Sequence, residues 1–172
     1  NQSLMDLNLS KSLDNVKENF PNRFGIFVNL DLNKIDDEDF AQSSVDILKD
    51  AVKQGAVGLK IYKNLGLNLK DSQGNRVKVD DPRLSPIWNT CGELNIPVLI
   101  HSGEPSPFFD PIDKFNERWL HARQKPGSFR PSDKYPSFDT VMQEQFNMFK
   151  NHPNTIFINA HMGWMANNLN EL

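Results

Sequence analysis

Residues 96–103 read IPVLIHSG and residues 155–163 read TIFINAHMG, and these two stretches decide the fold. In each of them a short apolar run of strand length leads directly to a histidine, His101 or His161. Strands that are apolar throughout, without alternation, are typical of parallel sheets that are buried on both faces. The two stretches therefore predict buried parallel strands that end in the same way.

Two further strands are predicted upstream by the apolar runs Phe24–Leu30 and Val57–Tyr62. Segments with apolar residues at helical spacing alternate with the strands, and they cover residues 9–20, 41–52, 84–94 and 138–149. This alternation predicts an α/β fold in which parallel strands alternate with helices.

The chain length limits the architecture, because a complete (β/α)₈ barrel takes roughly 250 residues and this chain has 172. Four strands fit either a small open α/β domain or about half of a TIM barrel. The first predicted helix has no strand before it, and a further helix is expected to begin after Gly163, which favours the half barrel. We expect residues 1–172 to form a single partial barrel domain.

One connection, residues 102–136, is long for a compact domain. Loops of this length are usually functional or disordered. Four aromatic residues argue against disorder, because disordered segments lack such groups; they are Phe108, Phe109, Phe115 and Trp119. We expect a folded lid or insertion.

Charge and composition exclude several classes of partner. With 19 basic and 22 acidic residues, the formal net charge of −3 offers no basic field for nucleic acid or for an anionic membrane. No apolar run approaches the ~18 residues of a transmembrane helix, and the start, NQSLMDLNLS, lacks signal-peptide features. We expect a soluble chain with a small-molecule substrate, its compartment open but the cytoplasm favoured. The unpaired edges of a half barrel suggest a homodimer.

His101 and His161 are the main candidate site residues. The carboxyl ends of parallel strands carry the active site in α/β folds, so both imidazoles are expected to face one crevice. A neutral imidazole binds divalent metals, and it exchanges a proton near neutral pH. The alternative is that each ring only hydrogen-bonds to neighbouring strands or loops. His121 and His152 are expected at the surface or at a helix end.

Three more side chains are candidates for contacting a substrate. Lys60 interrupts an apolar strand, so its amine either points into a cavity towards an anionic group or escapes to water at the sheet margin. Glu104, three residues after His101, is an acid/base candidate or a partner of the histidine, although an exposed loop carboxylate is commoner. Trp164 lines a pocket or packs against the lid.

The metal site that these residues suggest is incomplete. A catalytic zinc needs three or more ligands and an open position for water, and this chain offers one or two. The sequence contains no HxH or HExxH motif, no nucleophile elbow and no glycine-rich phosphate loop.

Three segments resemble the amidohydrolase family 2 branch of the metal-dependent hydrolase superfamily. They are GAVGLKIYKNLGL at 55–67, DPRLSPIWNTCGELNIPVLIHSGEP at 81–105 and NHPNTIFINAHMGW at 151–164. This resemblance implies a distorted TIM barrel with one or two divalent metals at the carboxyl ends of the strands. Its members include hydrolases, lactonases and nonoxidative decarboxylases.

The resemblance also assigns roles by position. The strands Phe24–Leu30 and Val57–Tyr62 correspond to the third and fourth of the barrel. His101 corresponds to the metal-binding histidine of the fifth strand, and His161 to the sixth-strand histidine that binds a metal or deprotonates the attacking water. Lys60 falls where some relatives have a metal-bridging lysine, and here it is kept as a substrate contact.

The first-strand HxH pair and the eighth-strand aspartate that the family leads one to expect are absent, so the chain looks like the middle of a longer enzyme. The function expected is that of a metal-dependent hydrolase acting on C–N or C–O bonds with a divalent metal, zinc by preference, and the fragment alone is expected to be inactive. The alternatives are a nonoxidative decarboxylase of an aromatic or unsaturated acid and a non-catalytic binding domain.

Overall fold

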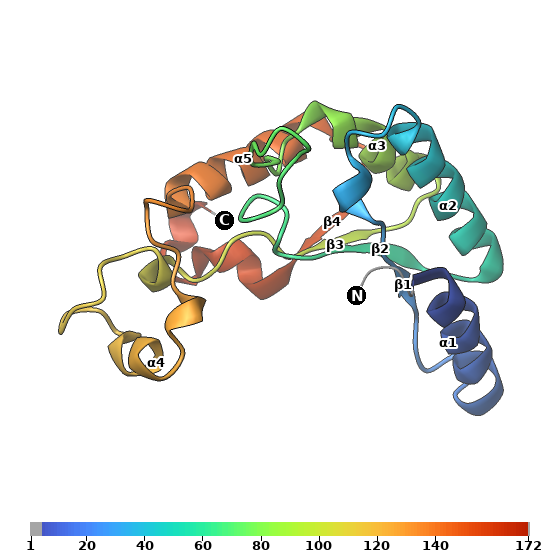
Figure 1. The fold of residues 1–172 in the computed structure, drawn as a ribbon. Helices are drawn as coiled ribbons and strands as arrows, with labels where there is room; N and C mark the ends of the chain where they lie inside the picture. The colour runs from blue at the N-terminus through green and yellow to red at the C-terminus, as the bar shows by residue number, and fades with distance from the viewer. Residues whose placement is uncertain (1–4, 172) are drawn as a thin grey trace.

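The computed structural model describes residues 5–171, which form an α/β fold (Figure 1). Its helices are α1 (Met5–Asn19), α2 (Phe40–Gln54), α3 (Ser85–Glu93), α4 (Trp119–Gln124) and α5 (Phe138–Asn151). Its strands are β1 (Phe27–Val28), β2 (Gly58–Ile61), β3 (Val98–Ile100) and β4 (Phe157–Asn159). Within residues 5–171, none of the helices has the length and apolar character that crossing a membrane requires.

The four strands form one sheet in the order β1-β2-β3-β4, and each neighbouring pair is parallel. The register aligns Leu59 with Val98, and Val98 with Phe157. Helix α2 connects β1 to β2, and α3 connects β2 to β3. The predicted fold of parallel strands alternating with helices is confirmed.

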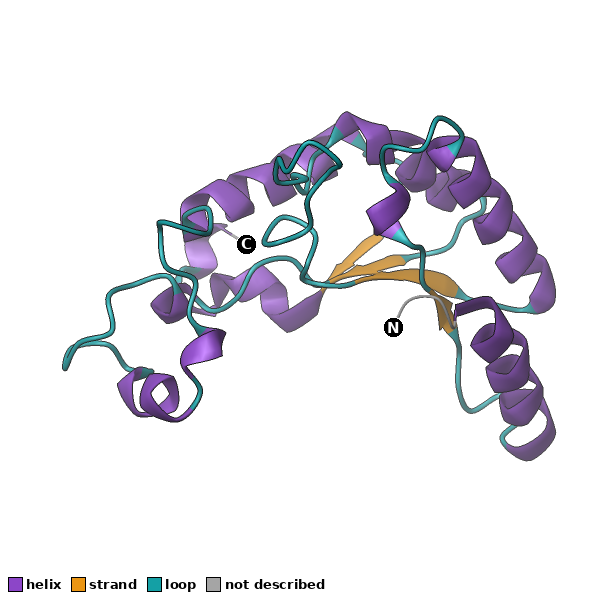
Figure 2. Ribbon diagram, in the orientation of Figure 1, coloured by secondary structure: helices purple, strands orange, loops and turns teal. Residues whose placement is uncertain are grey.

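One face of the sheet carries the hydrophobic core. Alternate side chains along a strand point to opposite faces, and the register places Leu59, Ile61, Val98 and Ile100 on the same one. All four are at most 2% exposed. Helices α2, α3 and α5 arch over this face (Figure 2), contributing Leu48, Ile87, Trp88, Cys91 and Met148 to the same core.

Cys91 is a packing residue, as its place on the apolar stripe of α3 predicts. The thiol is buried in the core, and burial raises its pKa to about 12. A thiol with so high a pKa stays protonated and unreactive at neutral pH.

The opposite face of the sheet is open. It presents Lys60 and Leu99, which are register partners, together with Ile158 and Tyr62. Ile158 is 44% exposed and Tyr62 51%. The side chains that extend from the carboxyl ends of the strands therefore stand beside an uncovered surface.

Strand β1 is shorter than the apolar run Phe24–Leu30 predicts. Only Phe27 and Val28 pair, with Gly58 and Leu59 of β2. Phe24 is 62% exposed, so burial on both faces does not extend over the whole run. The reason is that β1 lies at the edge of the sheet and has β2 as its sole partner among the described residues.

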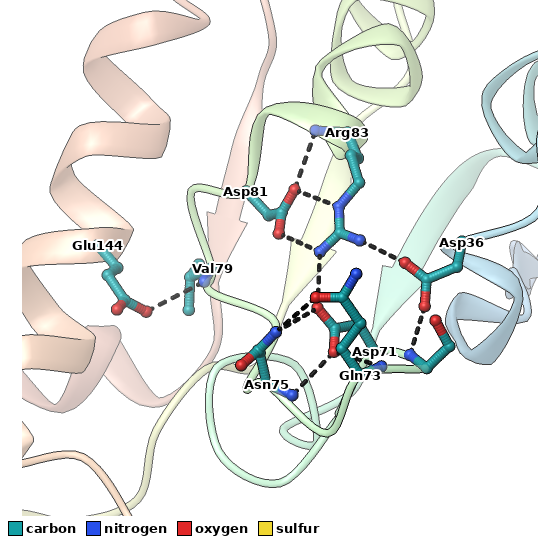
Figure 3. A network of polar contacts seen from close by, with 9 residues as sticks. Asp36, Asp71, Gln73, Asn75, Val79, Asp81, Arg83 and Glu144 are labelled. Carbon is teal, nitrogen blue, oxygen red and sulfur yellow. Dashed lines mark hydrogen bonds and ion pairs between the residues drawn. The ribbon is translucent and has the colours of Figure 1, made fainter.

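The long loop between β2 and α3 is fastened to α5 by an ion pair. Glu144 accepts hydrogen bonds from both terminal nitrogens of Arg76, at 2.8 and 2.5 Å. It also accepts from the backbone N–H of Val79 at 3.1 Å (Figure 3). The Glu144 side chain is 8% exposed, and its hydrogen bond is the main cause that raises the pKa of Arg76. Paired charges of this kind tolerate burial because each satisfies the other.

A second polar network joins the β1–α2 and β2–α3 connections (Figure 3). Arg83 donates to Asp36 at 2.7 Å, and it donates from Nε and Nη2 to the two oxygens of Asp81 at 2.9 and 2.7 Å. Asp36 also accepts from the backbone N–H of Ser72 at 2.5 Å, and Asp71 lies 4.0 Å from Arg83. Arg83 thus holds the β1–α2 connection against the β2–α3 connection.

Residues 102–136 form a folded lid, which extends away from the sheet and includes α4 (Figure 1). Two parts of the lid are joined by a hydrogen bond and by a ring contact. The backbone N–H of Arg130 donates to the Phe108 carbonyl at 2.8 Å, and the ring centroids of Phe108 and Phe129 are 5.7 Å apart. Phe115, one of the four aromatic residues that predicted a folded segment, is 83% exposed.

Arg83 makes the stability of the fold depend on pH. The pKa of Asp36 lies below its ordinary value of 3.8 because the Ser72 N–H and Arg83 donate to its carboxylate. Burial alone would raise the pKa of Asp81, but the hydrogen bonds from Arg83 lower it overall. Folding therefore favours the charged forms of both carboxyl groups. The resulting stabilisation is present above the ordinary pKa of 3.8, and it is lost as the pH falls through the lowered pKa values of the folded state.

We expect the free energy of unfolding, measured by urea denaturation, to fall between about pH 5 and about pH 3 more steeply in the unmodified chain than in Arg83→Gln. The variant also loses about 1 kcal/mol at neutral pH, because the network is partly exposed. Arg23→Gln, which removes the same charge from the exposed turn after α1, serves as the control. Equal pH slopes for the chain and for Arg83→Gln would contradict this account.

Candidate active site

The two strand-end histidines lie next to each other. Ile100 of β3 is in register with Asn159 of β4, so the chain reaches His101 and His161 at the same edge of the sheet. The ring centroids are 4.8 Å apart, and the ring planes make an angle of 71°. The structure thus brings together the two imidazoles that the sequence singled out.

The backbone that carries His161 turns left-handed directly after β4. Four consecutive residues, His161 to Trp164, have φ values of 57°, 54°, 59° and 62°. This region costs L-residues roughly 1–2 kcal/mol each, and such strain gathers at functional sites. The helix that we expected to begin after Gly163 is present only as short 3₁₀ segments, which follow the left-handed residues and end with Leu169–Glu171.

Trp164 fixes the position of the His161 ring. The two rings are stacked, with centroids 4.5 Å apart and an angle of 20° between their planes. The indole Nε1 donates to the carbonyl of Ser102 at 2.9 Å, which ties the turn to the residue after His101. Trp164 is therefore placed beside both histidines, and His101 is 5.7 Å from it between centroids.

A buried glutamine supports this arrangement from below. The Ser102 hydroxyl donates to Oε1 of Gln145 in α5, and Gln145 is fully buried. Its Nε2 has no hydrogen-bond partner among the described residues. Sequence reasoning missed Gln145, although a polar residue on the buried stripe of a helix is the signal that could have found it.

His101 is poised in its neutral form. Burial is the main cause that lowers its pKa to about 4, and the charges of His161 and Lys60 lower it further. Its Nε2 is buried and has no hydrogen-bond partner among the described residues. A neutral imidazole with an unused ring nitrogen is the form in which histidine coordinates a metal.

Lys60 lies on the same face of the sheet as His101. It is in register with Leu99, two residues before His101, so strand alternation directs both side chains to the open face. Lys60 is half-buried, burial lowers its pKa, and its Nζ lies 5.6 Å from the centroid of the Tyr62 ring. The amine therefore stays at the sheet and does not extend freely into water.

Glu104 is buried and paired, unlike an ordinary loop carboxylate. Its Oε1 accepts from Lys63 Nζ and from Arg130 Nη2, each at 2.6 Å. Lys63 belongs to the loop after β2, and Arg130 belongs to the lid. The structure thus places Glu104 as a bridge between loop and lid, and Lys63 and Arg130 are charged residues of this region that the sequence did not single out.

Two other sequence candidates lie outside the site. His121 lies in α4, its Nε2 3.0 Å from the Ser128 hydroxyl. His152 is buried at the end of α5, where burial lowers its pKa and Asn89 contacts its Nδ1 at 3.0 Å. His152 thus lies at a helix end, one of the two places expected for it, and it is buried there.

Among residues 5–171, no group of three or more histidine, cysteine or acidic residues could hold a metal ion together. His101 and His161 nevertheless fit two positions of such a site, since one has a buried unpaired nitrogen and the other ring is adjacent. By themselves the two histidines do not make a complete metal site within the described residues.

Comparison with known proteins agrees with this geometry. A family model for the amidohydrolases matches residues 14–171, and the chain belongs to this family. It is an α/β chain whose four parallel strands correspond to half of an amidohydrolase-type barrel. No curated protein matches the sequence.

Solved structures match the fold at low sequence identity. A 2,6-dihydroxybenzoate decarboxylase complexed with 2,6-dihydroxybenzoate has a TM-score of 0.55 and 18% identity, covering 95% of this chain and 46% of that one. The 2,6-dihydroxybenzoate decarboxylase from Rhizobium gives 0.54 and 19%, with coverage of 95% and 46%. A Staphylococcus aureus protein assigned as an amidohydrolase gives 0.56 and 18%, with coverage of 96% and 50%. The chain spans about half the length of these structures.

The turn around His161 depends on Gly163. A Cβ at this position would overlap the amide of Asn159 and lie 3.1 Å from Nε2 of Gln145. We expect Gly163→Ala to lower the free energy of unfolding by roughly 2–4 kcal/mol in urea denaturation, because steric overlap adds to the left-handed φ.

Gly74→Ala is the matched control for that variant. Gly74 also has a left-handed φ of 82°, but nothing lies within 4 Å of its added Cβ. Its cost should be about 1 kcal/mol, which reflects the backbone alone. An equal loss of unfolding free energy in the two variants would show that Asn159 and Gln145 do not lie against Gly163 as described.

Proposed function

We propose that this chain forms part of a metal-dependent hydrolase of the amidohydrolase type, which cleaves a C–N or C–O bond with a metal-activated water. The observation that carries the proposal is the pair of imidazoles, 4.8 Å apart at the carboxyl ends of two adjacent parallel strands. Family membership supports it, because amidohydrolases use this edge of the barrel.

His101 would hold the metal, zinc by preference. Its ring is neutral at physiological pH, because burial and the neighbouring cations lower its pKa to about 4, and its Nε2 is free of other partners within the described residues. A divalent metal bound there supplies Lewis-acid chemistry and lowers the pKa of a bound water. We infer that the remaining ligands come from segments outside this chain.

His161 would accept the proton of the attacking water and return it to the leaving group. Its ring is exposed at the open face and held by stacking on Trp164, 4.5 Å away, so it is both accessible and oriented. Positioned proton transfer of this kind typically contributes 10²–10⁴-fold in rate, a general range for histidine catalysts. Lys60, on the same face, would bind an anionic group of the substrate.

We expect the chain itself to bind Zn²⁺ weakly, with a Kd no tighter than about 1 µM by calorimetry, because two imidazoles fill only half of a tetrahedral shell. His101→Ala should abolish this binding. His121→Ala, which removes a lid histidine outside the site, should leave it unchanged. Unaltered zinc binding in His101→Ala would overturn the proposed metal position, and tight stoichiometric zinc in the unmodified chain would contradict an incomplete ligand set.

The reaction type is tested by product analysis on a longer protein that contains this chain. A hydrolase should give products that together contain one added water, with activity lost in His161→Ala and restored in part by added imidazole. Decarboxylation is the second candidate, since two of the matched structures are decarboxylases. Release of CO₂ without a hydrolysis product would end the hydrolase proposal.

A further inference from the structure

A pocket of about 260 Å³ lies between the loop that follows β2 and the lid. The loop lines it with Lys63, Asn64 and Asn68, and the lid lines it with Gly127, Arg130 and Tyr135. One wall therefore belongs to the sheet edge and the other to the insertion. A ligand seated here would contact both.

The pocket has an excess of positive charge. Lys63 and Arg130 share a single carboxylate oxygen of Glu104, each at 2.6 Å, so two cations are opposed by one anion. No carboxylate is among the residues that line the pocket. The surplus charge favours an anionic ligand, because it acts in a partly enclosed space where screening by water is reduced.

Glu104 does not use all the hydrogen-bond donors of Lys63 and Arg130. The Lys63 side chain is 48% exposed, and its ammonium has three donors, of which Glu104 takes one. Nε of Arg130 is buried and has no acceptor among the described residues. The side-chain amides of Asn64 and Asn68 can add further donors at the same rim.

The pocket lies close to the paired histidines. Lys63 follows the end of β2 by two residues, and Glu104 follows His101 by three. The charges of Lys63 and Glu104 both act on the imidazole of His101, the first lowering its pKa and the second raising it. A small molecule reaching from the pocket towards the strand ends would therefore approach the histidines.

We propose that this pocket binds the carboxylate of a small organic acid and so holds the anionic end of the substrate away from the reacting bond. The link to the substrate rests on the proposed function, whereas binding of the anion does not. A monoanion matches the single surplus charge, and Tyr135 offers an aromatic surface to the body of such a ligand. Phosphate carries more charge than the single surplus cation and therefore matches the pocket less well.

The test is a titration of the ¹⁵N-labelled chain with benzoate, followed by amide chemical shifts. We expect saturable shifts at Gly127 and Asn68, with a Kd on the order of 1 mM. Benzamide, the neutral counterpart of benzoate, should bind at least about threefold more weakly, and so should inorganic phosphate. Benzamide binding as tightly as benzoate would overturn the proposal, and tighter binding of phosphate would overturn the carboxylate assignment.

Two variants should change benzoate affinity in opposite directions. Lys63→Gln removes the surplus charge and should weaken binding at least about threefold, whereas Glu104→Gln removes the opposing anion and should strengthen it by a similar factor. Lys49→Gln, an exposed charge on α2, is the control and should change nothing. Unchanged affinity in Lys63→Gln would refute the site.

A salt series on the unmodified chain keeps the proposal testable if a variant fails to fold. Benzoate affinity should fall as ionic strength rises, and benzamide affinity should not. A benzoate affinity that is independent of salt would overturn the role of charge. None of these measurements needs a metal or turnover, so the pocket can stand if the hydrolase proposal fails, and the reverse also holds.

Discussion

The parallel pairing of β3 with β4 is the constraint on which the candidate site depends. The two strands run in the same direction, and Ile100 is in register with Asn159. Their carboxyl ends therefore lie side by side, and so do His101 and His161, which follow them. An antiparallel pair would have sent the two histidines to opposite ends. The hydrophobic core beneath, where Val98 and Ile100 are fully buried, holds that register in place, since a slip by one residue would expose every core side chain of the strand.

Polar contacts join the loops above that edge to one another, and buried apolar side chains such as Leu65, Val77 and Val79 anchor the β2–α3 loop in the core. Arg83 joins Asp36 and Asp81, Arg76 joins the β2–α3 loop to Glu144 of α5, and Glu104 joins loop to lid. Charge-assisted hydrogen bonds are directional, so they add fixed contacts between loops whose apolar side chains already pack into the core. The sheet supplies the position of the histidines, and the ion pairs supply the shape of the space around them.

The sequence predicted what depends on local pattern. Apolar runs located the strands, helical spacing located α2, α3 and α5, and the shared position of His101 and His161 after a strand located the central pair. What it missed depends on contacts between distant residues. The approach of Lys63 and Arg130 to one carboxylate joins residues that lie 41 and 26 positions from Glu104 in the sequence. The left-handed turn at His161 is not visible in local propensities. Strand β1 is shorter than its apolar composition predicts, because it lies at the edge of the sheet.

The left-handed turn after β4 has a further consequence for the rim of the sheet. A backbone that winds in this sense pays a steric penalty with every residue it adds, so it ends after a single revolution. The left-handed turn therefore stops after four residues, and the side chain of His161 at its start stays exposed. The chirality of the amino acids thus limits how much backbone is placed beside that imidazole, one face of which is covered by the stacked ring of Trp164.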